Sequence, residues 1–270
     1  MRYIDKGHGL AACAAEGMLQ LLFPLSTYCV CCGKPVDASR SYSICDHCIH
    51  HITWGNVHID LEAESRRLGR PARLDSAVAC MKYGLYERRL IFDLKYDGRT
   101  YVARAIGHIM ADRLAAEGFA ATLDSCFEMS NRPGTLCGGF DYIVPVPVHR
   151  DKEKARGFNQ AEKMARHLGR RIGVPVLPRA IVRERNTAAQ RSLSAEDRYF
   201  NLEGAFSLNP KEAVKIRGSR ILLLDDVYTT GATAHRCGDV LKEAGAARVD
   251  FIALATGNDF AYGFFDDEQC

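Results

Sequence analysis

The chain has 270 residues, of which 47% are hydrophobic and 26% are charged. This length and composition suit a soluble protein with a buried core, built as one large domain or as a medium domain with a small one. The net charge of +3 at pH 7 permits an anionic ligand or nucleic acid without demanding either. The sequence holds no run of 18 apolar residues, which argues against a membrane span.

The first 25 residues differ from a secretory signal peptide. Their positive end is weak, and Asp5 and Glu16 interrupt the apolar run. Apolar spacing instead predicts an amphipathic helix over residues 10–23, which ends before Pro24. We therefore expect a cytoplasmic protein.

Two cysteine pairs follow this helix. Cys29 and Cys32 are separated by two residues, as are Cys45 and Cys48, and twelve residues lie between the pairs. Thiolates at this spacing predict a tetrahedral Zn²⁺ site that closes a small ribbon. The alternatives are a pair of disulfides, which are uncommon in a cytoplasm, and a degenerate site without metal.

Other residues of the predicted ribbon leave further alternatives open. Cys31 lies inside the first pair and is expected to be a bystander. A nearby histidine could replace one cysteine ligand. The candidates are His47, His50 and His51. Together with Trp54, Lys34 and Arg40, they also give the ribbon a basic and aromatic character that suits single-stranded nucleic acid, although such residues are common on any surface.

The rest of the chain alternates between apolar runs typical of strands and amphipathic helices. Residues 56–74 are charged and polar and predict a linker or an exposed connection. Strands are predicted over residues 76–83, 141–148, 220–227 and 248–256, with another beginning at residue 174. Helices are predicted over residues 87–95, 101–118, 159–173 and 232–246, and loops over residues 118–139 and 183–200, the second of them mobile. This alternation predicts a parallel sheet with helices on both faces.

The stretch "ILLLDDVYTTGATA" (residues 221–234) places two carboxylates, Asp225 and Asp226, at the end of a buried strand. The following loop has small side chains and leads into a helix N-terminus, whose free N–H groups suit a phosphate. Gly231 lets the backbone approach the ligand. Because carboxylates repel phosphate and accept hydrogen bonds from sugar hydroxyls, the pattern predicts a ribose 5-phosphate site.

Two other interpretations of this stretch exist. A strand ending in two aspartates could be the magnesium-binding half of a nucleoside triphosphatase, but the required GxxxxGK[ST] motif is missing from the sequence. The aspartates could also simply cap the following helix, which leaves the threonine-rich loop unexplained.

A second candidate binding segment is "HRDKEKARGFNQ", which follows the predicted strand 141–148. Four cations at two-residue steps in a loop can converge on one polyanion, such as a diphosphate. They are Arg150, Lys152, Lys154 and Arg156. The alternative is an ordinary solvated basic face.

The order of these motifs resembles the ComF family, which is competence-associated and similar to type I phosphoribosyltransferases. The segments that carry the resemblance are "CVCCG…CDHC", "LKYDGR", "DYIVPVPVHR", "ARGFNQ", "AAQRSLSAEDRYFNLEGAF" and "LLLDDVYTTGAT". They cover roughly residues 28–256. Lysines stand where the family often has arginines in the basic segment, so charge is kept and the fork geometry is not.

The resemblance implies an α/β fold with a parallel-sheet phosphoribosyltransferase core preceded by a zinc ribbon. The expected segments are an N-terminal helix and ribbon (1–55), a connecting or hood region (56–139) and a core (140–270). The ligand is expected to be phosphoribosyl pyrophosphate (PRPP) with Mg²⁺. Its expected binding residues are Asp225, Asp226, Thr229, Thr230, Gly231, Ala232, Thr233, Arg150, Lys154 and Arg156.

If transfer occurs, the resemblance implies that Asp225, Asp226 and Arg191 are catalytic. Arg191 belongs to a segment similar to the flexible loop of these transferases, as do Arg183, Arg185, Gln190 and Arg198. Lys95, Tyr96 and Arg99 of "LKYDGR" resemble a family motif ahead of the core and could reach the site from the hood region, but no role follows for them from the sequence. The expected partners are PRPP, single-stranded DNA and a competence helicase or other DNA-uptake proteins. Two hypotheses remain: a transferase with an unknown acceptor, and a non-catalytic PRPP sensor that binds nucleic acid.

Overall fold

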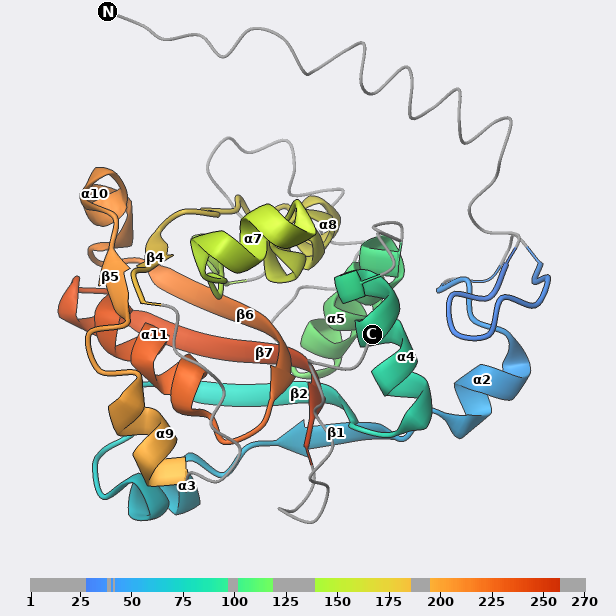
Figure 1. The fold of residues 1–270 in the computed structure, drawn as a ribbon, viewed down its shortest axis with the longest axis horizontal. Coiled ribbons are helices and arrows are strands. Elements are labelled where there is room, and N and C mark those ends of the chain that lie inside the picture. Colours follow the sequence, from blue (N-terminus) through green and yellow to red (C-terminus); the bar gives the residue numbers. More distant parts are fainter. Residues whose placement is uncertain are drawn as a thin grey trace, which may run out of the picture.

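The computed structural model describes residues 28–37, 40, 42–96, 102–118, 139–185 and 195–257 (Figure 1). The predicted helix over residues 10–23 lies outside this part of the chain. Each helix in the described part is too short or too polar to cross a membrane.

The centre of the fold is a five-stranded sheet with the order β1-β2-β7-β6-β3. Its strands are β1 (Trp54–His58), β2 (Ser76–Lys82), β3 (Tyr142–Pro145), β6 (Arg220–Tyr228) and β7 (Arg248–Thr256). All neighbours run parallel except β1, which pairs antiparallel with β2 at the edge. The predicted parallel sheet with helices on both faces is thus confirmed, with one antiparallel edge strand added.

Helices cover both faces of this sheet because the central strands are apolar on both sides. One face packs against α5 (Val102–Ala116) and α8 (Gln160–Ile172), with α4 (Leu85–Tyr96) beside α5. The other face packs against α11 (Ala232–Glu243). Side chains alternate accordingly along β6: Leu222 and Leu224 belong to the first core, and Leu223 to the second.

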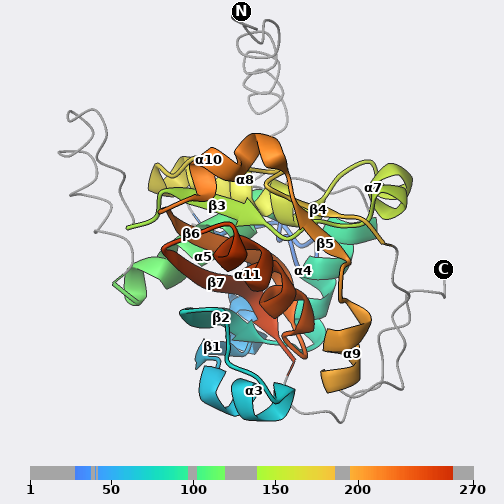
Figure 2. The ribbon, with the colours of Figure 1, turned by 90° about the vertical axis from the view of Figure 1, so that its left-hand side faces the viewer.

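The smaller elements surround this framework. They are α2 (Asp46–His51), α3 (Leu61–Leu68), α7 (Arg150–Arg156), α9 (Ala195–Asn201), α10 (Ala213–Ile216), a 3-10 turn (Pro210–Glu212), and the two-stranded sheet of β4 (Ile181–Arg183) and β5 (Phe206–Leu208). Figure 2 shows α9 between α3 and α11, and it contacts both.

The expectation of a linker over residues 56–74 is wrong. This segment completes β1 and forms α3. The Asp60 side chain caps α3 by accepting hydrogen bonds from the N–H groups of Glu62 and Ala63, and Gly69 ends it in the left-handed conformation. Strands β1 and β2 therefore belong to the same sheet as β6 and β7. The boundaries of the three expected segments stay a prediction.

Two other local expectations need correction. The strand expected from residue 174 is reduced to a bridge between Val176 and Ile143, because the chain leaves the sheet edge there. Residues 183–200 were expected to be a loop, but residues 195–201 form α9. Tyr199 of α9 is buried and donates a hydrogen bond to Asp239 of α11, which provides tertiary support for this short helix.

The contact between α5 and α8 depends on a glycine. A Cβ atom at Gly107 would lie 2.7 Å from the His167 Cβ atom and 2.9 Å from the Leu168 backbone nitrogen. We expect Gly107→Ala to lower the free energy of unfolding by about 1–3 kcal/mol, as in other overpacked sites. Urea unfolding followed by circular dichroism measures this.

Gly238→Ala on α11 is the matched control. Its Cβ atom would first meet the Leu74 Cδ2 atom at 3.0 Å, a side-chain terminus that can move. The higher helix propensity of alanine, about 1 kcal/mol, counters that contact, so we expect a net change within about 1 kcal/mol. Equal losses at both positions would contradict the tight α5–α8 packing.

Candidate ligand site and cysteine cluster

The loop between β6 and α11 forms a small hollow at the carboxyl end of the sheet. Its lining residues are Asp225, Val227, Tyr228, Thr229, Thr230, Gly231, Ala232, Thr233, Ala234 and Phe251. The sequence-predicted loop residues therefore gather at one place. Asp225 lines the same hollow, whereas Asp226 does not.

Gly231 is required by the backbone of this loop. Its φ of +71° is in the left-handed region, and a Cβ atom there would lie 2.2 Å from the Tyr228 hydroxyl oxygen. Gly231 is also the N-cap of α11, and it has no side chain with which to cap the helix. The first N–H groups of α11 can therefore serve an anion, as the sequence suggests.

The Tyr228 hydroxyl beside Gly231 is part of a hydrogen-bond network that the sequence did not reveal. It donates to Glu64 of α3 at 3.1 Å and lies 3.4 Å from Nε2 of His235 on α11. Glu64 Oε2 lies 3.6 Å from the same His235 nitrogen. The network joins α3, β6 and α11 directly beneath the loop.

The two aspartates turn to opposite faces of the sheet. Asp226 contacts Lys95 of α4 and Gln160 of α8, with Nζ and Nε2 at 2.9 and 3.5 Å from its Oδ2 atom. Asp225 lines the hollow on the α11 side, and its Oδ1 atom accepts a hydrogen bond from the Asp226 N–H. Consecutive residues of a strand diverge in this way, so the two carboxylates have separate surroundings.

These surroundings shift the pKa values of the two carboxyl groups in opposite directions. Burial raises the pKa of Asp225 well above its ordinary range, and the charge of Asp226 adds to this. Burial acts in the same direction on Asp226, but the Lys95 ammonium group outweighs it and lowers the pKa of that carboxyl. Burial alone would lower the pKa of Lys95, yet Asp226 raises it. Asp226 and Lys95 thus form an ion pair beside a carboxyl group that resists ionisation.

The basic segment after β3 is a helix, not the expected loop. His149 caps α7 by accepting from the Asp151 N–H, and Gly157 ends it in the left-handed conformation. Two-residue steps in a helix turn by about 200°, so the four cations do not share a face. Arg150, Lys152 and Lys154 are exposed.

Among the basic residues of α7, Arg156 is linked to Asp226 through Gln160. Its Nη1 atom donates to Gln160 Oε1, and Gln160 donates in turn to Asp226. Asn159 positions this corner, since its side chain donates to the Val146 carbonyl at 3.0 Å and caps α8 by accepting from the Ala161 N–H. Gln160 is the first residue of α8, and the turn at Gly157 brings it next to Arg156 at the end of α7.

The residues of the expected flexible loop and of "LKYDGR" have different outcomes. Arg191 and Gln190 lie outside the described residues, as does Arg99. Of Arg198 and Tyr96 the structure describes the backbone alone. Arg183 on β4 lies over the Phe206 ring at 5.5 Å, and burial lowers its pKa. Arg185 donates to the Asn201 carbonyl at 3.1 Å.

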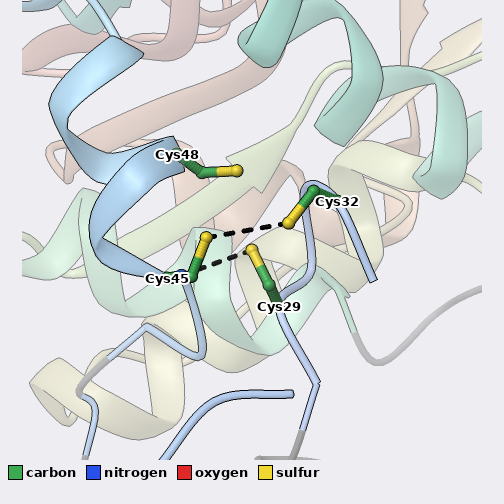
Figure 3. Close-up of side chains that lie close together, drawn as sticks. All are labelled: Cys29, Cys32, Cys45 and Cys48. Atoms are coloured by element: carbon green, nitrogen blue, oxygen red, sulfur yellow. Dashed lines mark hydrogen bonds between the residues drawn. The ribbon is translucent and has the colours of Figure 1, made fainter. Parts of the chain in front are cut away.

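The four paired cysteines meet in one cluster, which Figure 3 shows in close-up. The sulfur atoms of Cys29, Cys32, Cys45 and Cys48 all lie within 4.8 Å of one another. The Cys32 and Cys45 sulfurs are 3.6 Å apart. Tetrahedral ligation with Zn–S bonds of about 2.3 Å requires sulfurs roughly 3.8 Å apart, so the donor set and the spacing fit a metal ion such as Zn²⁺.

The backbone around the cysteine cluster positions the thiols and affects the pKa of Cys29. Gly33 turns the first knuckle with a φ of +73°, and the Cys45 N–H donates to the Cys29 sulfur at 3.3 Å. Burial would raise the pKa of Cys29, but backbone N–H groups outweigh it and lower that pKa to about 7. Burial raises the pKa of Cys31, which is outside the four-sulfur group, as expected for a bystander.

The histidines of α2 are also outside the four-sulfur group. His47 and His51 stack with ring centroids 4.2 Å apart, and His47 Nε2 lies 3.2 Å from the Tyr86 hydroxyl of α4. Trp54 is close by, with its ring 6.2 Å from that of Tyr42. These side chains form an aromatic surface beside the cysteine cluster.

A family model described as phosphoribosyl transferase domain matches residues 154–261. Competence protein F of Haemophilus influenzae is 38% identical over 114 residues, which cover 42% of this chain and 49% of that protein. DNA utilization protein YhgH of Escherichia coli K12 is 28% identical over 228 residues, or 84% of this chain and 83% of that protein. Competence protein ComFC of Bacillus subtilis is 34% identical over 105 residues, or 39% and 40% of the two chains. The chain thus matches about half the length of the first of these relatives.

Among solved structures, Leishmania donovani UMP synthase is 17% identical with a TM-score of 0.30, covering 77% of this chain and 29% of that one. A Bacillus subtilis glutamine PRPP amidotransferase is 19% identical with a TM-score of 0.29, covering 42% and 22%. The match to the phosphoribosyl transferase domain model and the similarity to Competence protein F, ComFC and YhgH support the resemblance to the ComF family.

Proposed function

We propose that this protein binds PRPP together with Mg²⁺ and takes part in competence or DNA utilisation, the roles named for its relatives. The observation that carries the proposal is the junction of β6 and α11, where Gly231 opens an uncapped helix N-terminus beside Asp225. Such a terminus binds a phosphate, and a carboxyl group next to it binds hydroxyls. A ribose 5-phosphate satisfies both.

The other end of PRPP carries a diphosphate, which needs cations. In our proposal residues of α7 supply them, and Arg156 is linked to Asp226 through Gln160. Arg150 and Lys154 lie one helical turn apart and are exposed to an incoming anion. Mg²⁺ prefers oxygen ligands and would neutralise the charge of the diphosphate, and Asp225 or Asp226 would help to hold it.

Two activities are compatible with this ligand. In a transferase, a nitrogen nucleophile displaces diphosphate from the anomeric carbon, and bound Mg²⁺ neutralises the charge of the leaving group. Arg191 would then help to stabilise that charge. In a sensor, PRPP binds and is released unchanged. An assay of diphosphate release with a panel of nucleobases distinguishes them, since a transferase should respond to one acceptor and a sensor to none.

The aromatic surface beside the cysteine cluster supports single-stranded DNA as a second partner. In proteins that bind single-stranded nucleic acid, the bases stack on aromatic side chains and basic side chains lie along the phosphate backbone. Trp54 is 40% exposed and Tyr28 is 60% exposed. A cytoplasmic location and contact with a competence helicase or other DNA-uptake proteins belong to the same proposal.

The first test uses Gly231→Ala. Its Cβ atom would collide with the Tyr228 hydroxyl, so the loop has to change shape. We expect the affinity for PRPP with Mg²⁺ to fall at least ~10-fold, or about 1.4 kcal/mol, in calorimetric titrations.

Gly218→Ala is the matched control for this variant. Gly218 also has a left-handed φ, +73°, but its Cβ atom would have nothing within 4 Å. It should cost about 1–2 kcal/mol of stability, as a strained φ does, while PRPP binds as in the wild type. If wild-type protein binds no PRPP, or Gly231→Ala binds it unchanged, the proposed site is wrong.

The second test concerns the metal. We propose that the cysteine cluster binds structural Zn²⁺, and elemental analysis should find about one zinc ion per chain. Cys29→Ser should lose most of the zinc and lower the melting temperature, because the remaining thiolates cannot close the tetrahedron. Cys31→Ser should keep its zinc, since Cys31 is outside the four-sulfur group. Native protein purified without zinc or any other transition metal would refute the assignment.

A further inference from the structure

Lys95 reaches Asp226 from helix α4, a contact to which the sequence alone assigned no role. Its Nζ atom lies 2.9 Å from Asp226 Oδ2, which also accepts from Gln160 at 3.5 Å. The other oxygen, Oδ1, accepts from the Val227 N–H at 2.9 Å. Both oxygens of Asp226 therefore already have partners within the protein.

The helix that carries Lys95 is firmly held. Leu90 and Leu94 of α4 are fully buried, and Glu87 is 1% exposed and accepts a hydrogen bond from the Thr53 N–H at 2.7 Å. The Lys95 side chain itself is 24% exposed, whereas that of Asp226 is 7% exposed. The packed helix therefore holds the Lys95 ammonium group next to Asp226, and a ligand in the site can still contact this partly exposed group.

Charge explains why a cation is needed here. The Asp226 carboxylate is largely sequestered from water, and such a group attracts a cation strongly, because opposite charges interact more strongly in a low dielectric. The ammonium group of Lys95 occupies the position that such a cation would take at Asp226.

We propose that Lys95 is a positioning residue that fills the cation position at Asp226 and keeps divalent metal ions away from this carboxylate until a phosphorylated ligand brings its own. This rests on the proposed function, in which the ligand is PRPP with Mg²⁺. When that ligand binds, the ammonium group moves to a phosphate oxygen, and Asp226 becomes free to accept ligand hydroxyls. Arg156 donates to Gln160, which contacts Asp226, so its positive charge stays near this carboxylate before and after the ligand binds.

The test measures Mn²⁺ binding to the zinc-loaded full chain without PRPP, using the electron paramagnetic resonance signal of free Mn²⁺. Mn²⁺ favours oxygen ligands and leaves the thiolate cluster alone. We expect Lys95→Met to bind one Mn²⁺ at least ~10-fold more tightly than the wild type, since removing the ammonium group opens the position. Lys95→Arg, which keeps the charge, should behave as the wild type does.

Further variants make the result specific. Lys95→Met combined with Asp226→Asn should lose the gained Mn²⁺ site, because the carboxylate that holds it is gone. Lys95→Gln gives the same prediction as Lys95→Met and replaces it if the methionine variant fails to fold. Wild-type protein that binds Mn²⁺ as tightly as the uncharged variants do would overturn the proposal.

This experiment is separable from the test of the proposed function. Failure of the wild type to bind PRPP in calorimetry would overturn the PRPP assignment, whereas the Mn²⁺ comparison uses no PRPP. Conversely, if the wild type binds PRPP but the uncharged variants gain no Mn²⁺ site, the role of Lys95 is wrong and the PRPP site stands.

Discussion

The close approach of the Tyr228 hydroxyl to the backbone of Gly231 is the constraint on which the candidate site depends. The hydroxyl donates to Glu64 and lies beside His235, so one phenol ties the end of β6 to both α3 and α11. The loop above it can then expose the first N–H groups of α11 only if residue 231 has no side chain. The conformation of the loop and the proposed phosphate binding therefore both depend on Gly231.

The second feature is the separation of the two aspartates by the sheet. Strand geometry sends Asp225 toward the α11 side and Asp226 toward α4 and α8. The two adjacent aspartates are therefore chemically different. Burial raises the pKa of Asp225, whereas the Lys95 ammonium group lowers the pKa of Asp226. A ligand that reaches both must cross the end of the strand, as a ribose with hydroxyls on neighbouring carbons can.

Much of this architecture could be predicted from the sequence because it depends on local patterns. The apolar runs give β3, β6 and β7, and the loop residues gather where the strand–helix junction predicts. Linear charge patterns misled the prediction at α7, where the cation spacing suggested a loop. His149 and Gly157 provide the caps that make this segment a helix. Similarly, Asp60 and Gly69 were local signals for α3 within a stretch whose polarity suggested a linker.

The ion pair of Lys95 with Asp226 could not be predicted in this way, since its partners are distant in sequence and meet only after α4 packs on the sheet. The same holds for the cysteine cluster. Its spacing predicts the ligands, but not that Cys29, Cys31 and Cys48 belong to the same hydrophobic core as Leu90, Leu94 and the β6 residues Leu222 and Leu224.

That shared core determines how the cysteine cluster relates to the rest of the molecule. A ribbon attached by a flexible linker could lose its metal without effect elsewhere, whereas here the apolar neighbours of the thiols are also those of α4. Tyr86 at the start of α4 contacts His47 of α2, and Lys95 near its end contacts Asp226. Helix α4 therefore contacts α2, the helix that carries Cys48, at one end and the Asp226 carboxylate at the other (Figure 1). Because Leu90 and Leu94 of α4 share this core with the cysteines, the proposed metal ion would support the placement of Lys95 as well as the ribbon itself.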